Sequence, residues 1–183
     1  MLILASKSPR RQEILRDAGF EFVVRPSEVE EIRGPDEPPQ DYVQRLAKEK
    51  AGATPMGDGD VVLAADTVVV LRGEVLEKPA DAADATRMLK LLSGKTHEVY
   101  TGICLRSASR EIVDVARTKV HFVRMRPAEI RDYVASGEPM DKAGAYGIQG
   151  LASKFIRRVE GCYFNVVGLP VSLVYKHYER LSG

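Results

Sequence analysis

The segment VVLAADTVVVL, residues 61–71, constrains the fold more than any other part of the chain. A nearly continuous run of apolar, mostly β-branched residues is typical of a central strand buried on both faces of a sheet. Asp66 interrupts this run, and a buried carboxylate is costly unless it is paired or binds a cation. Asp66 is therefore either a structural group, capping a loop or pairing with a buried arginine, or a catalytic one. Its place in a central strand favours catalysis.

Helices and strands are predicted to intermix on both sides of this segment. Alternating or β-branched runs predict further strands at residues 2–5, 20–24, 96–105 and 112–123. A hairpin turn is predicted at Arg72-Gly73-Glu74. Apolar spacing and capping signals predict helices at residues 9–18, 40–53, 81–92 and 127–135 and one starting near Pro170, after strand-like or irregular chain at residues 155–167. We expect an α/β or α+β protein with a mixed, strongly twisted sheet, forming a single domain over residues 1–183.

Composition excludes several classes of function. The chain has 27 basic and 26 acidic side chains without a basic run, so it lacks the electrostatic signature of nucleic-acid binding. No stretch approaches about 20 consecutive apolar residues, and no leader pattern precedes the first strand. Cys104 and Cys162 stand outside any CxxC motif and are expected to be buried, reduced thiols. A soluble cytoplasmic protein without a membrane partner is expected.

The stretch LASKSPRRQEIL, residues 4–15, places two cations at the start of a helix. Ser8 is the predicted N-cap and Pro9 the first helical residue, so Arg10 and Arg11 fall in the first turn. The helix dipole disfavours cations there. Either the arginines extend into solvent or pair with an acidic neighbour such as Glu13, or they bind an anion such as phosphate together with the free N–H groups.

Further charged residues stand at the ends of predicted elements, namely Glu30, Glu31, Lys50 and Lys78. Each alone would be interpreted as a solvated surface charge. Together with the two arginines they could supply one cleft with the cations and carboxylates that a polyphosphate and a divalent metal require. The sequence contains no GxxxxGK[ST], GxGxxG, HExxH or GxSxG motif, so the common alternatives are not indicated.

A set of motifs is distributed over nearly the whole chain. They are LASKSPRRQEIL, EEI, LAKEKA, LAADTVV, EKPAD, LSGKTHEVYTG, DKAGAYGIQG and NVVGLP. On these motifs the sequence closely resembles the Maf-like nucleoside triphosphate pyrophosphatases. The resemblance implies a Maf/ITPase-like fold, with a twisted mixed sheet in two lobes around a central cleft, often assembled as a homodimer.

The resemblance also implies a reaction and the residues that perform it. Nucleoside triphosphates would be hydrolysed to the monophosphate and pyrophosphate with a divalent metal, Mg²⁺ or Mn²⁺. Asp66 would be the proton acceptor, and Glu31 and Asp66 would hold the metal. The residues implied to bind substrate are Ser6, Arg10, Arg11, Lys50 and Lys78.

Within the family, Arg10, Thr67 and Gln149 resemble the branch that acts on dTTP and UTP, and modified pyrimidine nucleotides are possible substrates. The Gln149 amide offers one donor and one acceptor, which match the N3–H and adjacent carbonyl of uracil or thymine. The neighbouring Gly147 and Gly150 would let a ligand approach the backbone closely. Alternatively, Gln149 is only a polar loop residue. The alternative function is a nucleotide-binding regulator of cell division or septum formation that does not hydrolyse its ligand.

Overall fold

The computed structural model describes residues 1–182 of the chain. These residues form two compact units. The first unit contains Met1–Thr67, Thr101–Ala116 and the chain from Gly168 onward, and the second contains Val68–Tyr100 and Arg117–Val167. The chain therefore leaves the first unit and returns to it twice.

The strands form a mixed sheet, as predicted. Their bounds are β1 Leu2–Leu4, β2 Phe22–Val24, β3 Val61–Leu71, β4 Glu74–Leu76, β5 Thr96–Arg106, β6 Glu111–Phe122 and β7 Ile156–Glu160. The order is β2-β1-β3-β5-β6-β7, with β4 beside β3. Strand β1 runs parallel to β2 and β3, whereas β4 is antiparallel to β3 and β7 to β6.

The helices also follow the predictions closely. Their bounds are α1 Pro9–Asp17, α2 Pro39–Ala53, α3 Ala82–Leu92, α4 Pro127–Ala135, α5 Tyr163–Val167 and α6 Val171–Ser182. Short 3-10 helices are η1 Glu138–Asp141, η2 Ala143–Ala145 and η3 Leu151–Phe155. Helix α5 was not predicted, because its five residues are too few to show a helical period.

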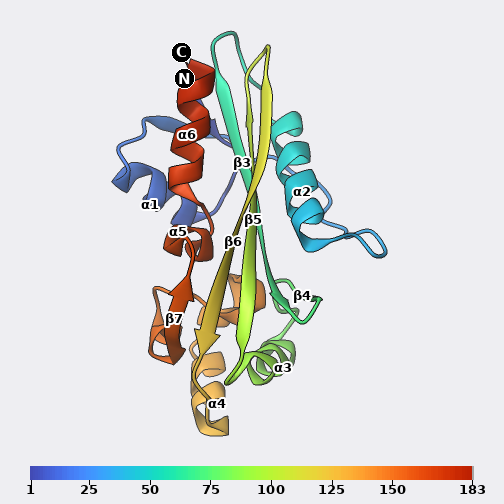
Figure 1. The fold of residues 1–183 in the computed structure, drawn as a ribbon, viewed down its shortest axis with the longest axis vertical. Helices are drawn as coiled ribbons and strands as arrows, with labels where there is room; N and C mark the ends of the chain where they lie inside the picture. Colours follow the sequence, from blue (N-terminus) through green and yellow to red (C-terminus); the bar gives the residue numbers. More distant parts are fainter. Residues whose placement is uncertain (183) are drawn as a thin grey trace. The chain divides into compact units, whose positions relative to one another are not determined.

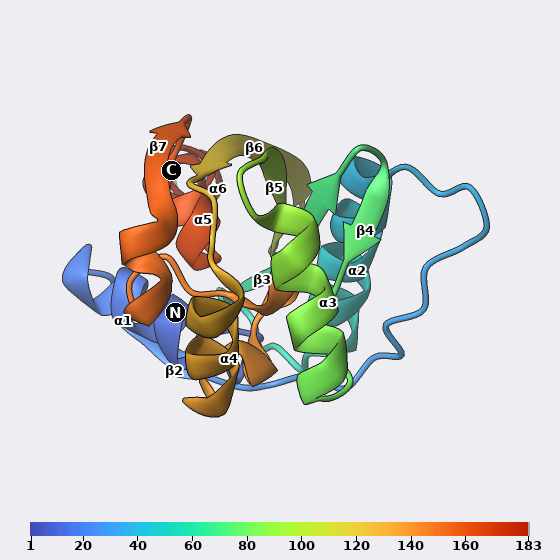
Figure 2. The same cartoon turned by 90° about the horizontal axis from the view of Figure 1, so that it is seen from below.

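In the first unit, helices cover both faces of the sheet. Helix α2 lies on one face, and α1 and α6 lie on the other (Figures 1 and 2). Small residues let α2 approach closely, since Ala47 and Ala51 pack on Ile3, Val62 and Cys104. This close packing places the last turn of α2 next to the middle of β3.

In the second unit, the core is more aromatic. It includes Leu89 of α3, Tyr133 of α4 and the side chains of Phe122 and Tyr146, whose ring centroids are 4.8 Å apart. The predicted hairpin is confirmed, because β3 and β4 are joined by Arg72 and Gly73, with φ of 52° and 86°. Two successive positive φ values are typical of a type I′ turn, which favours glycine.

The cysteine prediction is confirmed only in part. Both cysteines are free, but Cys104 is buried and Cys162 is partly exposed. Cys162 lies two residues after the end of β7, outside the buried core, so an apolar residue type alone did not predict its exposure. Among residues 1–182, no helix is long and apolar enough to cross a membrane.

Candidate active site

The loop after β1 forms the predicted helix start. Ser8 is the N-cap of α1, its Oγ accepts a hydrogen bond from the Arg11 backbone N–H at 3.4 Å, and Pro9 is the first helical residue. The Oγ of Ser6 accepts from the Ser8 N–H at 3.2 Å. Because no acidic residue lies in the first turn, the positive end of α1 is not neutralised locally.

Arg11 is held by a fan of hydrogen bonds to its guanidinium group. Nε donates to Gly168 O at 2.8 Å, Nη1 donates to Ala65 O at 2.8 Å and to Ser6 Oγ at 3.2 Å, and Nη2 donates to Thr67 Oγ1 at 3.1 Å. A guanidinium has five N–H groups, and protein acceptors take four of them. Arg11 is therefore a fixed cation that joins the loop after β1, strand β3 and the chain before α6.

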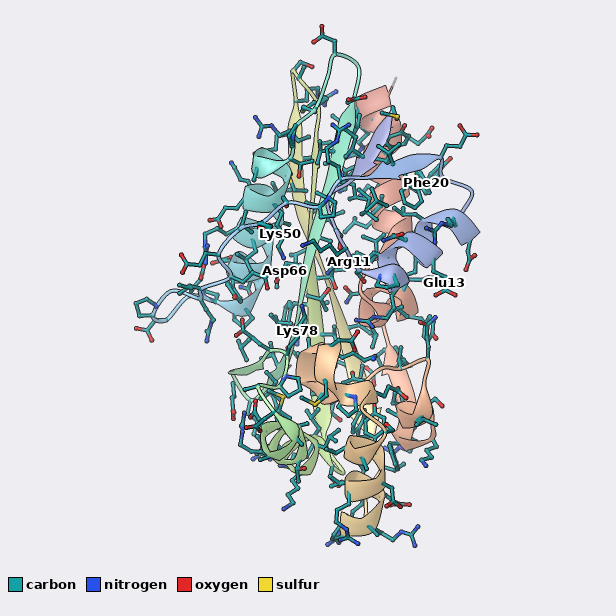
Figure 3. All side chains as sticks on the ribbon, turned by 180° about the vertical axis from the view of Figure 1, so that it is seen from behind. Arg11, Glu13, Phe20, Lys50, Asp66 and Lys78 are labelled. Atoms are coloured by element: carbon teal, nitrogen blue, oxygen red, sulfur yellow. The ribbon has the colours of Figure 1, made fainter. Side chains whose placement is uncertain are left out.

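The Arg11 side chain points into the protein and does not pair with Glu13. Figure 3 shows Glu13 on the outer side of α1, whereas Arg11 reaches toward β3, where Asp66 lies. Burial lowers the pKa of Arg11, Asp66 raises it, Arg10 lowers it and Glu31 raises it. Arg11 thus belongs to a cluster of interacting charges, and its hydrogen bonds go to the body of the protein.

Thr67 takes part in the same network. Its Oγ1 lies 2.9 Å from Thr101 Oγ1, in addition to accepting from Arg11. Thr101 is fully buried. Thr67 therefore fixes the orientation of Arg11 on β3, whatever further contact it makes with a ligand.

Asp66 lies in the middle of β3 and is paired with a lysine. Lys50 lies beside Asp66 (Figure 3), and its Nζ donates to Asp66 Oδ1 at 2.6 Å. The same Nζ lies 2.7 Å from Glu31 Oε1. The Asp66 and Lys50 side chains are each 11% exposed, whereas that of Glu31 is 47% exposed. One ammonium thus bridges two carboxylates. We call these two groups, the buried Asp66 and the solvent-facing Glu31, the carboxylate pair.

The carboxylate pair can be tested as a place for a divalent metal. Both oxygens contact the same ammonium, so one cation could contact both. Across the described chain, no group of three or more His, Cys, Asp or Glu side chains could hold a metal ion. Mg²⁺ typically keeps several waters and uses one or two carboxylates plus substrate phosphates. The carboxylate pair fits a metal of this kind.

Two predicted site residues belong to the second unit. Lys78 is exposed in the loop between β4 and α3. Gln149 is exposed in a turn closed by the Gly150 N–H bond to Gly147 O at 3.3 Å.

Side chains of the same unit lie close to the glycines beside Gln149. A Cβ at Gly150 would lie 2.0 Å from Glu138 Oε1, because this carboxylate accepts from the Leu151 N–H at 2.9 Å. A Cβ at Gly147 would meet Lys142 at 2.8 Å. The space beside both glycines is therefore occupied by side chains of this chain.

Sequence reasoning missed several members of the Arg11 network. Ala65 and Gly168 contribute backbone carbonyls, which leave no mark on residue type. Thr101 lies within LSGKTHEVYTG and Gly168 within NVVGLP, two motifs that carried no predicted site residue. The available signal for Thr101 and Gly168 was that both lie within motifs on which the family resemblance rests.

Comparison with known proteins identifies close relatives. Residues 1–181 match the family described as "Maf-like protein". A Koribacter versatilis protein named "dTTP/UTP pyrophosphatase" is 53% identical over 180 residues, which cover 98% of this chain and 93% of that protein. A Bacillus cereus protein of the same name is 46% identical over 182 residues, covering 99% and 95%.

A solved structure shares the fold at low sequence identity. A HAM1 protein from Coxiella burnetii superposes with a TM-score of 0.51 at 17% identity, covering 98% of each chain. This similarity supports the mixed α/β fold expected from the sequence.

Proposed function

The chain belongs to the Maf-like protein family, and from this premise we propose that it hydrolyses dTTP and UTP to the monophosphate and pyrophosphate. The observation that carries the proposal is Asp66, a carboxylate in the middle of a buried strand that contacts Lys50 and lies in the field of Arg11. Buried, interacting charges of both signs are typical of a catalytic centre.

In the proposed reaction, Asp66 accepts a proton from a water molecule that attacks the α-phosphorus. The water oxygen bonds to this phosphorus while the bond to the oxygen bridging the α- and β-phosphates breaks, and pyrophosphate leaves. In the free protein a cation, the Lys50 ammonium, already occupies the position at Asp66 Oδ1, so Oδ2 is the oxygen assigned to the proton. Positioned proton transfer of this kind typically contributes about 10²–10⁴-fold to a rate.

The cations bind the triphosphate and stabilise the negative charge that develops on the leaving group. We assign this role to Arg10, Lys50 and Lys78, and we assign Ser6 to substrate binding as well. Arg11 contributes a fixed positive charge, and protein acceptors leave one of its five N–H groups for a phosphate oxygen.

The carboxylate pair, Glu31 and Asp66, would hold a divalent cation such as Mg²⁺ or Mn²⁺. When bound, such a cation neutralises phosphate oxygens. The support for this assignment is that two carboxylates converge on a single positive charge, that of Lys50.

Base selection is assigned to Gln149, Thr67 and Arg10. The exposed Gln149 amide has the donor and acceptor that the N3–H and carbonyl of uracil or thymine require. Modified pyrimidines with the same edge would be accepted as well. Free cysteines are consistent with a reducing compartment, and we place the activity in the cytoplasm.

We further propose that the chain forms a homodimer through the edge of strand β2. Val23 and Val24 are 37% and 40% exposed there. An antiparallel pairing of two copies centred on Val23 sets Glu21 of each opposite Arg25 of the other, a favourable cross-strand pair. Sedimentation analysis should show a dimer that Val23→Lys converts to a monomer, and an unchanged mass would contradict this pairing.

A panel of natural and modified triphosphates, with product identification, tests the proposed function. With Mg²⁺ or Mn²⁺, we expect dTTP and UTP to yield dTMP and UMP with pyrophosphate. Asp66→Asn should reduce turnover by about 10³-fold or more without loss of folding. Asp58→Asn, an exposed aspartate in the turn before β3, is the matched control.

Two outcomes would contradict the proposal. Release of orthophosphate would exclude attack on the α-phosphorus. Tight binding of triphosphates that survive long incubation would favour a regulator that senses nucleotides.

A further inference from the structure

The Lys50 ammonium occupies a position that a metal ion would also need. It lies between the carboxylate pair, 2.6 Å from Asp66 Oδ1 and 2.7 Å from Glu31 Oε1. A cation that used both carboxylates as ligands would need this same space. Lys50 and such a cation therefore compete for one position.

Positive charge already matches negative charge in this cluster when no metal is present. Glu31 and Asp66 are matched by Lys50, which contacts both, and by Arg11, whose pKa both carboxylates raise, and Arg10 adds a further positive charge beside Arg11. A divalent cation added alone would leave an excess of positive charge and would have to displace the ammonium for only two protein ligands. The same cation carried by a triphosphate brings phosphate ligands and the negative charge that restores the balance.

The two basic residues of the cluster differ in their freedom to move. Arg11 is held by acceptors on β3, on the loop after β1 and at Gly168. Lys50 is anchored through its backbone, where Thr54 Oγ1 donates to Lys50 O at 2.8 Å, and its ammonium contacts side chains. A lysine on a flexible four-carbon stem can exchange a carboxylate for a phosphate oxygen, whereas the Arg11 guanidinium cannot leave its network without breaking it.

Glu31 provides the route by which the exchange can begin. Its side chain is 47% exposed, whereas those of Lys50 and Asp66 are 11% exposed. Glu31 lies outside the helices and strands, between β2 and α2. An incoming cation therefore meets the exposed carboxylate first and reaches Asp66 by displacing Lys50.

We propose that the Lys50 ammonium holds the carboxylate pair in the free protein, and that a divalent cation replaces it only together with a triphosphate, to which Lys50 then transfers. This proposal rests on the site assigned under the proposed function. It assigns Lys50 two successive partners, the carboxylate pair before substrate binds and a phosphate afterwards. Metal and nucleotide are expected to bind with strong positive cooperativity.

Binding of Mn²⁺ to the full-length protein, measured by electron paramagnetic resonance with and without a nucleotide analogue, tests the proposal. Wild-type protein should bind Mn²⁺ weakly alone, and at least about tenfold more tightly with the non-hydrolysable analogue α,β-methylene-dTTP. Lys50→Met should bind Mn²⁺ alone at least about tenfold more tightly than wild type, because the competing ammonium is gone. Combining it with Glu31→Gln should remove the gain.

Lys48→Met is the matched control, because Lys48 lies on the same helix and its ammonium pairs with Glu111, 2.9 Å away, outside the cluster. It should leave Mn²⁺ binding unchanged. Tight Mn²⁺ binding by wild type without nucleotide, or a folded Lys50→Met variant that gains nothing, would overturn the proposal.

A thermal measurement on wild type keeps the test valid even where Lys50→Met does not fold. Mn²⁺ alone should leave Tm unchanged, and Mn²⁺ with α,β-methylene-dTTP should raise Tm above the value with the analogue alone. An equal rise with Mn²⁺ alone would overturn the proposal while leaving hydrolysis intact. Failure of the proposed function would instead be seen as absent hydrolysis with the cooperative Mn²⁺ binding preserved.

Discussion

The two units bury different kinds of polar group. Within residues 1–182, the buried lysine and the buried aspartate, Lys50 and Asp66, both belong to the first unit. The buried polar side chains of the second unit are His97, Thr118 and Asn165, among large apolar residues. Burying charge is costly, so a unit that does so repeatedly gives up stability.

This difference follows from the side chains through which each unit packs. In the first unit, α2 packs through small residues such as Ala47 and Ala51, which bring Lys50 close to β3. In the second unit, large side chains fill the interior, and Lys78 and Gln149 lie exposed outside this core. The first unit therefore buries charged side chains, whereas the second carries exposed polar side chains on an apolar, aromatic core.

The largest effect on stability is expected from Arg11→Met. Loss of the guanidinium leaves four acceptors without their donor and removes a cation near Asp66, which should lower the free energy of unfolding by about 3–5 kcal/mol. Urea unfolding followed by circular dichroism measures this loss, and hydrogen exchange should localise it to the first unit. Arg16→Met, at the exposed end of α1, should cost less than about 1 kcal/mol. Equal losses would show that the Arg11 network is not a structural element of the first unit.

A smaller effect, confined to acid conditions, is expected from the second unit. His97 is buried and its Nε2 lies 2.7 Å from the Tyr146 hydroxyl. Burial, and to a smaller extent the neighbouring His121, lower the pKa of His97 to about 3. Between that value and the ordinary pKa near 6.5, the unfolded chain binds a proton that the folded chain does not, so stability falls as pH falls through this window. The contribution of His97 between pH 7 and pH 4 is about 3 kcal/mol.

Urea unfolding of wild type and His97→Gln at pH 7 and pH 4 isolates this contribution. The variant should lose about 3 kcal/mol less than wild type over this range. Tyr146→Phe is the control, since His97 stays buried and the pH dependence should persist. A wild-type slope that His97→Gln leaves unchanged would contradict the assignment.

Sequence patterns predicted the elements of both units better than their contacts. The β-branched run at residues 61–71 and the Ser8-Pro9 helix start are properties of local chain, and both were confirmed. The inward position of Lys50 could also have been predicted, because it continues the apolar stripe of Val43 and Ala47 on α2. The partners of Arg11 could not, because Ala65 and Gly168 bind it through carbonyls that every residue possesses.

The smallest effect concerns the two thiols, each of which reports on one unit. Burial raises the pKa of the Cys104 thiol to about 12, so this thiol is neutral and shielded in the folded first unit. Cys162 is partly exposed in the second unit. Native protein treated with iodoacetamide at pH 8 should therefore be alkylated at Cys162 first, as peptide mass spectrometry would show. Arg11→Met should speed the alkylation of Cys104 and leave that of Cys162 unchanged, because only the first unit is weakened. Equal acceleration at both cysteines would mean that the two units open together.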